Sequence, residues 1–484
     1  MKNLTVKIFV GLFVVAAVLL QSCKKDSETY SFLLNERGAF VEEPGGTTSL
    51  GFTAINISSV TPTTVPQGWS VTVDMNERRI SVTAPMTFPD DPKTLADGEE
   101  EEEENTNVRF GTVYLTGRSS GGSSVSTSLY VSLAETVDLT GQPSNCYIIN
   151  KSNARYCIDV TRKGEDTEAT MSPASVAILW ETPYKVIEFP KLVDGKAYFY
   201  HAIGTDDDEK EFFNHGNALL GAFDAAGNLL WSWHLWCAEF DPADEQVELG
   251  GEVMMKRNLG AGVVSGTSEE DILASYGVYY QWGRKDPFYG GEKTETSANA
   301  FLEAKNGTVV NPAYPALDWA FSKSATTTDG AAANPMTFYN DKVGTGYNWL
   351  ASPNATLWGE AKTLNDPCPP GYRVPGTGAW EDLISGRQYI DGVSVWDGTN
   401  YGMTYTHGEQ TAWYPAQGYR NYSSGAIVGL RSSTGGSGAY WSAETSSVKS
   451  YYLFFRSKLS SSGSINNELD MNRSYGYTVR CCKE

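Results

Sequence analysis

The chain has 484 residues, carries a formal net charge of −21, and is rich in glycine (48), tyrosine (27) and tryptophan (13). This length suits about two to four domains at roughly 150 residues each. Such acidity disfavours contact with phosphate backbones, so nucleic acid is not an expected partner, and the glycine- and aromatic-rich composition predicts a mainly β protein with some α+β structure.

Residues 1–22 have the layout of a signal peptide. Lys2 and Lys7 precede an apolar run over residues 8–20 that is too short to span a membrane comfortably. The run leads into Leu-Gln-Ser-Cys at residues 20–23, which resembles a bacterial lipobox cleaved before Cys23. The alternative is an ordinary cleaved signal followed by an incidental cysteine. The lipobox interpretation predicts acyl chains on Cys23, and more than one chain gives stable membrane anchoring.

A charged cluster, KKDSE, follows the expected anchor at residues 24–28. It resembles the surface-export signal of Bacteroidetes lipoproteins, and the alternative is a plain polar tether. We therefore expect residues 23–30 to form a lipid-anchored tether. The resemblance implies an outer-membrane protein that faces the cell exterior.

Short alternating runs dominate residues 31–135. In the segment GWSVTVDMNERRISVTAP (68–85), Trp69, Val71 and Val73 share one strand face, and Ile80 and Val82 return after a polar turn. Repeated strands and turns of this kind predict an antiparallel β-sandwich. The order of these strands resembles the BACON-type and related immunoglobulin-like modules of Bacteroidetes. Modules of that kind often act as spacers, so no site is assigned here.

A second β-sandwich is predicted over residues 146–250, after a linker at 135–145. Two apolar runs flank the turn at residues 224–228, which predicts a hairpin. Trp231 and Trp233 fall on one face of the second strand and are expected to fill the core, although a sugar-stacking platform is the alternative. His234 lies on the other face, where a structural role is expected.

Residues 251–484 are irregular and aromatic. Ser268 is a predicted N-cap, followed by acidic residues and apolar positions at helical spacing. A second short helix is predicted in GTGAWEDLISG (376–386), where Gly386 ends it.

Five sequence blocks in this region carry a family resemblance. They are NDPCPPGYRVP with AWEDL, WYPAQGYRN, GAYWSAE, YYLFF and NRSYGYTVRCC, in that order over about 120 residues. The series resembles the Fibrobacter succinogenes major paralogous domain, which is similar to the formylglycine-generating-enzyme type of C-type-lectin-like fold. Upstream segments such as YGVYYQWGRKDPF resemble fimbrillin-associated, tip-like surface proteins. The resemblance implies a C-type-lectin-like α+β domain over residues 251–484.

The departures from that family limit what the resemblance implies. The paired active-site cysteines of the formylglycine enzymes have no counterpart, and the Glu-Pro-Asn or Gln-Pro-Asp triplet of calcium-dependent lectins is missing. The sequence has only four histidines and no Cys-x-x-Cys spacing, so zinc ligation is poorly supported. We therefore expect no enzyme, no catalytic residue, no metal and no cofactor.

The closing strand that the resemblance implies would return Cys481 or Cys482 to Cys368. A disulfide between Cys368 and Cys481 is favoured, with Cys482 as partner or reduced thiols as alternatives. Arg373 and Arg480 beside these cysteines are expected to pair with Glu381 or Asp382. The pairing of the other cysteines is open: Cys146 and Cys157 could form a bridge or remain reduced thiols, and Cys237 has no evident partner.

Two aromatic, polar segments at residues 396–414 and 419–441 are the candidate recognition loops, because loops on a rigid scaffold carry much of protein function. The leading hypothesis is an anchored adhesin that binds a glycan or a host or bacterial protein. A fimbrial accessory or tip subunit with fimbrial partners is the alternative. The candidate ligand-binding residues are Trp396, Tyr401, Tyr405, His407 and Trp413.

Overall fold

The computed structural model describes residues 29–89, 106–205, 210–290, 309–430, 436–457 and 465–484. Residues 1–28, which hold the expected signal peptide, the lipid-anchor residue Cys23 and most of the tether, lie outside the described residues. The described chain is mainly β, as composition and patterning predict. Within it, no helix has the length and apolar character needed to cross a membrane.

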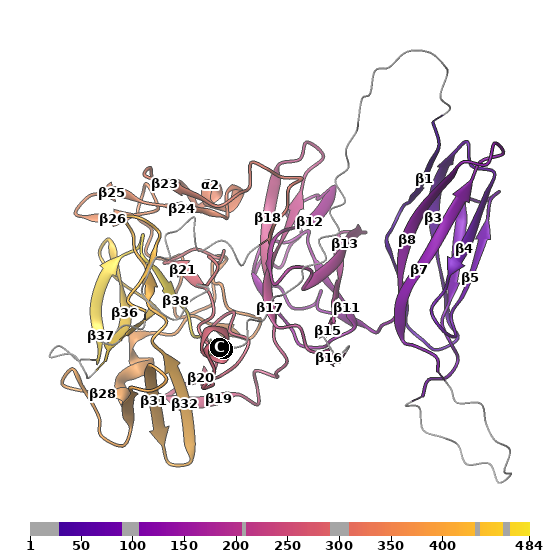
Figure 1. Ribbon diagram of the computed structural model, residues 1–484. Coiled ribbons are helices and arrows are strands. Elements are labelled where there is room, and N and C mark those ends of the chain that lie inside the picture. Colours follow the sequence, from indigo (N-terminus) through magenta and orange to yellow (C-terminus); the bar gives the residue numbers. More distant parts are fainter. Residues whose placement is uncertain (1–28, 90–105, 206–209, 291–308, 431–435, 458–464) are drawn as a thin grey trace, which may run out of the picture.

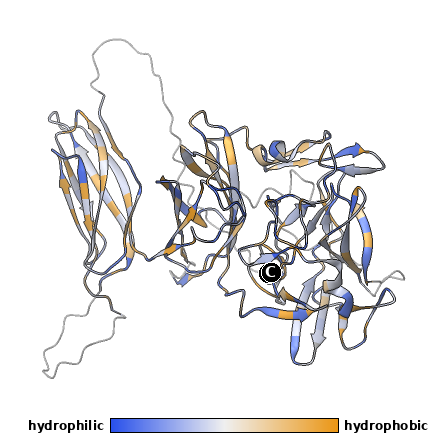
Figure 2. Ribbon diagram, turned by 180° about the vertical axis from the view of Figure 1, so that it is seen from behind, coloured by the Kyte–Doolittle hydropathy of each residue, from blue (hydrophilic) through white to orange (hydrophobic). Residues whose placement is uncertain are grey.

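The first module is a sandwich of two four-stranded sheets, with strand orders β1-β3-β6-β5 and β2-β8-β7-β4 (Figure 1). Apolar and polar residues alternate along its strands (Figure 2), so the inner faces of the two sheets pack together. Ile80, Val82, Val113 and Leu129 in this core are fully buried. Its strands are β1 Ser31–Leu34, β2 Gly38–Val41, β3 Thr47–Ile55, β4 Ser59–Thr64, β5 Ser70–Asp74, β6 Arg79–Thr83, β7 Phe110–Arg118 and β8 Ser124–Leu133.

The second module is also a two-sheet sandwich, of orders β10-β18-β17-β12-β22 and β13-β14-β11-β9, with a separate ribbon β15-β16. Trp231 and Trp233 fill the core between its sheets, which confirms their predicted structural role. Asp224 organises the predicted hairpin turn by accepting from the Asn228 amide at 2.8 Å. The strands are β9 Thr136–Asp138, β10 Cys146–Ile149, β11 Ala154–Asp159, β12 Ser175–Thr182, β13 Ile187–Val193, β14 Lys196–His201, β15 Gly204–Thr205, β16 Glu211–Phe212, β17 Gly216–Phe223, β18 Leu229–Cys237 and β22 Val309–Val310.

The core does not stop at the predicted boundary near residue 250. Trp236 and Cys146 of the second module pack with Trp282 and Trp349 of the following region, and strand β22 from that region pairs with β12. The physical reason is visible in β17 and β18, which are buried at almost every position. A strand covered on both faces has a continuous apolar run rather than an alternating one. The described residues between 146 and 484 therefore share one continuous packing unit.

The third region, residues 251–484 with the preceding strand β19, is built around a seven-stranded sheet of order β34-β33-β38-β35-β36-β37, in which β21 pairs with β38. The described part of this region also contains a four-stranded sheet, β19-β20-β39-β27, and a three-stranded sheet, β30-β31-β32. Three two-stranded ribbons, β23-β24, β25-β26 and β28-β29, complete it. The strands are β19 Gln246–Leu249, β20 Glu252–Met255, β21 Tyr279–Gln281, β23 Ala320–Ser322, β24 Thr337–Tyr339, β25 Asp341–Val343, β26 Gly346–Asn348, β27 Tyr372–Arg373, β28 Ile384–Ser385, β29 Gln388–Tyr389, β30 Ser394–Asp397, β31 Gly402–His407, β32 Gln410–Pro415, β33 Tyr419–Arg420, β34 Ile427–Val428, β35 Ser437–Ser446, β36 Lys449–Arg456, β37 Ile465–Asn472, β38 Gly476–Thr478 and β39 Cys482–Lys483.

Helices are short in this region. Helix α1 (Glu269–Ala274) begins at the predicted N-cap, where the Ser268 hydroxyl accepts from the Asp271 amide at 3.0 Å. Helix α2 (Thr328–Ala333) was not anticipated. The second predicted helix is a 3-10 helix, η2 (Thr377–Leu383), and Gly386 follows it with a φ of +55° in the β28-β29 ribbon.

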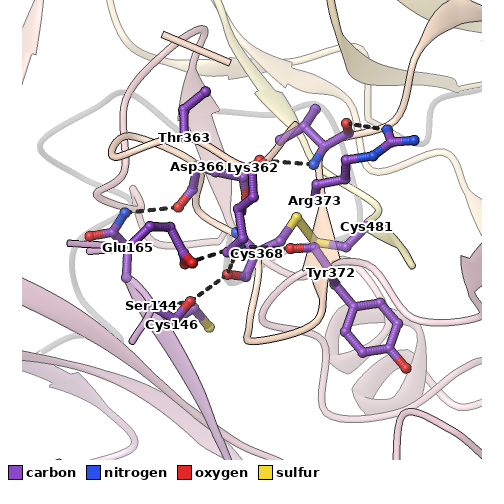
Figure 3. A network of polar contacts seen from close by, with 12 residues as sticks. Ser144, Cys146, Glu165, Lys362, Thr363, Asp366, Cys368, Tyr372, Arg373 and Cys481 are labelled. Carbon is purple, nitrogen blue, oxygen red and sulfur yellow. Dashed lines mark hydrogen bonds and ion pairs between the residues drawn. A yellow bond between two sulfur atoms is a disulfide. The ribbon is translucent and has the colours of Figure 1, made fainter. Parts of the chain in front are cut away.

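Cys368 and Cys481 form a disulfide across a sequence separation of 113 residues. Figure 3 shows this bridge beside a buried lysine, Lys362, whose ammonium donates to the carbonyls of Cys368 and Tyr372, both at 2.7 Å, and to Asp366 at 3.0 Å. From the second module, the Ser144 hydroxyl donates to the Cys368 carbonyl at 2.8 Å. The network therefore ties the second module to the disulfide-bonded part of the third region.

Four other described cysteines, Cys146, Cys157, Cys237 and Cys482, are buried free thiols. Cys146 and Cys157 lie in strands of opposite sheets of the second module, β10 and β11, and are not bridged.

The arginine pairs expected next to the disulfide were wrong. Arg373 pairs instead with Glu252 at 2.9 Å, and Arg480 donates to the side-chain oxygen of Asn258 at 2.9 and 2.6 Å. Glu381 and Asp382 are exposed.

Glu181 in β12 gives the fold a pH dependence. Its side chain is buried, and this burial raises its pKa from 4.5 to about 7. Between those values the folded chain holds a proton that the unfolded chain has released, so this group's contribution to stability falls as pH rises from about 4.5 to 7. We expect Glu181→Gln to flatten that part of the stability profile, measured by urea unfolding at several pH values. An unchanged slope would contradict this assignment.

Candidate functional site

The three-stranded sheet β30-β31-β32 has two different faces. Neighbouring residues of a strand point to opposite faces, and Met403, Tyr405 and Tyr414 are fully buried in the core behind the sheet. Thr404 and its register partner Trp413 lie on the other face, which is only half-buried. This outward face forms one wall of a cavity.

The cavity, which we name the Trp413 groove, has a volume of about 500 Å³. Its second wall comes from the segments around β19, β20 and the loop that precedes α1. A volume of this size is in the range of small-molecule sites. The lining residues are Asp244, Glu245, Lys256, Val264, Ser265, Gly266, Thr267, Asp397, Asn400, Thr404, Thr411, Ala412 and Trp413.

Trp413 is held in a fixed position in this groove. Its indole lies against Gly402 so closely that a Cβ at 402 would stand 2.3 Å from the ring. Its backbone carbonyl accepts from the Arg480 guanidinium at 2.7 Å, and Arg480 is in turn stacked 3.8 Å from the centre of the Tyr414 ring. A half-buried aromatic residue whose backbone is hydrogen-bonded and whose ring packs on Gly402 is a preorganised contact surface.

The opposite wall is also fixed. Arg257, which is buried, donates to Glu245 at 2.5 and 2.7 Å and to the Gly262 carbonyl. On the sheet side of the groove, Asp397 at the end of β30 closes its own turn by accepting from the amides of Thr399 at 2.7 Å and Asn400 at 3.0 Å. Arg257 offsets the negative charge of Glu245. The other charged lining residues are Asp244, Asp397 and Lys256, so the groove carries only a small net negative charge.

Burial raises the pKa of the Tyr405 and Tyr414 hydroxyls behind the sheet, which keeps both neutral at ordinary pH. Among the described residues, no group of three or more His, Cys, Asp or Glu side chains is placed to hold a metal ion. The arrangement is suited to binding a polar, uncharged molecule that has one flat apolar face.

The five predicted ligand-binding residues have different positions. Trp413 lines the groove. Trp396 packs against the core behind the sheet, with its ring 6.3 Å from that of Tyr401. Tyr405 was wrongly predicted as a ligand contact: it is fully buried, because strand alternation turns it inward with Met403. The side chain of His407 lies outside the described parts of the chain.

Sequence reasoning missed the second wall of the groove. Asp244, Lys256 and residues 264–267 are far from β32 in the sequence, and no motif links them to it. A weak signal was present in the glycine- and serine-rich stretch VVSGTS at residues 263–268, which is typical of adaptable loops.

No protein-family model and no curated protein matches the chain. Among solved structures, the Bacteroides ovatus mixed-linkage glucan utilization locus SGBP-B in complex with a mixed-linkage heptasaccharide is similar at 11% identity over 42% of this chain and 43% of that one, with a TM-score of 0.12. The human desmocollin-1 ectodomain is similar at 11% identity over 44% and 41%, with a TM-score of 0.15. SporoSAG from Toxoplasma gondii is similar at 8% identity over 41% and 93%, with a TM-score of 0.13.

The chain spans less than half the length of the first two of these structures. Similarity at these TM-scores identifies neither a common fold over the whole chain nor a shared ligand.

Proposed function

We propose that this protein is a non-catalytic binding protein that recognises a saccharide in the Trp413 groove. The observation that carries the proposal is the fixed, half-buried Trp413 side chain beside hydroxyl, amide and carboxylate groups. A sugar ring has a flat face of C–H groups that can contact the indole. Its hydroxyls can form hydrogen bonds with the surrounding polar side chains.

The groove's rigid walls support a binding role. Arg480 fixes the Trp413 side and Arg257 fixes the Glu245 side, so little conformational entropy is lost when a ligand enters. The lipobox-like motif ending in Cys23 supports anchoring in the outer membrane, and the charged cluster after it supports exposure to the cell exterior. In this proposal the first module is a spacer, while residues 146–484 form the recognition unit.

The prediction that tests this function is Trp413→Ala. The chain from residue 24 should bind a defined subset of oligosaccharides on a glycan array, and the substitution should weaken that binding by about tenfold or more, as expected for an aromatic hot spot. Tyr184→Ala is a matched control, because Tyr184 is a 62% exposed aromatic residue of the second module.

Two results would contradict the proposal. One is binding that Trp413→Ala leaves unchanged. The other is no saccharide binding combined with co-purification of the protein with fimbriae, which would favour the fimbrial accessory or tip role.

A further inference from the structure

A second cavity lies where the first and second modules meet. This joint cavity has a volume of about 310 Å³ and sits between the start of β2 and the strands β11, β13 and β14. Its lining residues are Asn35, Glu36, Arg37, Gly38, Phe40, Arg155, Phe189, Pro190, Lys191, Tyr198 and Phe199.

The walls of the joint cavity are built by direct contacts between the two modules. The Phe40 ring lies 5.0 Å from that of Tyr200 and 5.7 Å from that of Phe189. The hydroxyls of Tyr130 and Tyr200 are hydrogen-bonded at 2.9 Å. The backbone of Phe189 has a φ of +54°, a conformation that residues other than glycine rarely adopt. The packing of its ring holds this conformation in place. The cavity is therefore preformed.

The charges that line the joint cavity are unusual for so acidic a chain. Three cations, Arg37, Arg155 and Lys191, face one carboxylate, Glu36. Lys191 already pairs with Glu36 at 2.8 Å. Within the described residues, no acceptor pairs with the guanidinium group of Arg37 or Arg155. Two guanidinium groups are thus left without a counter-ion in the part of the chain that the structure describes.

Aromatic rings hold one of these two groups in position. The Arg155 guanidinium lies 4.3 Å from the centre of the Tyr198 ring and 5.8 Å from that of Phe40. Stacking fixes the plane of the guanidinium and leaves its N–H edge available. A carboxylate fits such an edge because its two oxygens accept two parallel N–H bonds.

We propose that the joint cavity binds a carboxylate-bearing sugar, with Arg155 and Arg37 holding the carboxylate and the aromatic walls contacting the sugar ring. This site lies between the first and second modules, whereas the Trp413 groove belongs to the third region. The proposal goes beyond saccharide recognition at Trp413 and does not depend on it.

The test is a calorimetric titration of the full chain with sodium glucuronate and, separately, with glucose as its neutral counterpart. Glucuronate should bind more tightly than glucose, and binding should weaken as salt is added. Arg155→Gln should weaken glucuronate binding by about tenfold, as for loss of a charge-assisted pair. Arg37→Gln is a second variant whose exposed side chain makes misfolding an unconvincing explanation of any loss.

One control separates this site from the rest of the molecule. Arg387→Gln removes an arginine of the third region whose side chain is 69% exposed. This variant should bind glucuronate like the unsubstituted chain. Equal affinity for glucose and glucuronate, no detectable glucuronate binding, or binding that neither Arg155→Gln nor Arg37→Gln alters would overturn the proposal.

Discussion

Replacing Cys368 with serine is expected to lower the free energy of unfolding by roughly 2–5 kcal/mol. The disulfide joins Cys368 to Cys481 over 113 residues of chain, most of which lies in short strands and irregular segments. Closing so long a loop removes much conformational freedom from the unfolded chain. Both cysteines are also fully buried, so loss of the bridge disturbs packing as well.

The measurement is urea unfolding with and without a reductant that reaches the unfolded chain. The unsubstituted protein should lose stability under reducing conditions, whereas Cys368→Ser should be insensitive. Cys482→Ala is a matched control, because Cys482 is the adjacent buried residue and is a free thiol; it should keep the sensitivity to reductant. If Cys482→Ala abolished that sensitivity, the disulfide would have been assigned to the wrong cysteine.

Lys362→Met should be about as damaging, with a loss of roughly 3–5 kcal/mol. The Lys362 side chain is 3% exposed and its partner Asp366 is completely buried. Methionine retains the apolar length of the side chain but leaves the Asp366 carboxylate without its cation. It also removes the ammonium that donates to the carbonyls of Cys368 and Tyr372, of which the Cys368 carbonyl still accepts from the Ser144 hydroxyl. An uncompensated buried charge costs far more than a lost surface pair.

Lys449→Met is the control for this prediction. Lys449 pairs with Asp470 at 3.1 Å, but the two side chains are 38% and 34% exposed. Surface pairs of this kind contribute about 0–1 kcal/mol. Equal losses for the two variants in denaturant unfolding would show that the buried network around Lys362 contributes no more to stability than a surface ion pair.

Much of the β architecture could be predicted from local pattern. Alternation in the first module placed Trp69, Ile80 and Val82 in the core, and they are buried there. The two-tryptophan face of β18 was also predicted to be core. These predictions succeed because side-chain alternation depends on the strand alone.

Features that depend on distant segments could not be predicted in this way. The apolar positions of β17 and β18 indicated strands, but not that the third region would cover their second face. Tyr405 and Trp413 belong to the same aromatic stretch, yet one is in the core and the other in the groove. The strand register decides between them, and a single-residue change of register exchanges the two faces.

The central claim is that Trp413 is the contact surface for a saccharide. It is tested most directly by fluorine NMR of the chain labelled with 5-fluorotryptophan, in which Trp413→Phe identifies the Trp413 resonance. Titration with an oligosaccharide selected on the array should shift that resonance in a saturable way and leave those of the buried Trp231 and Trp233 unchanged. A saccharide that binds without moving the Trp413 resonance would contradict the assignment.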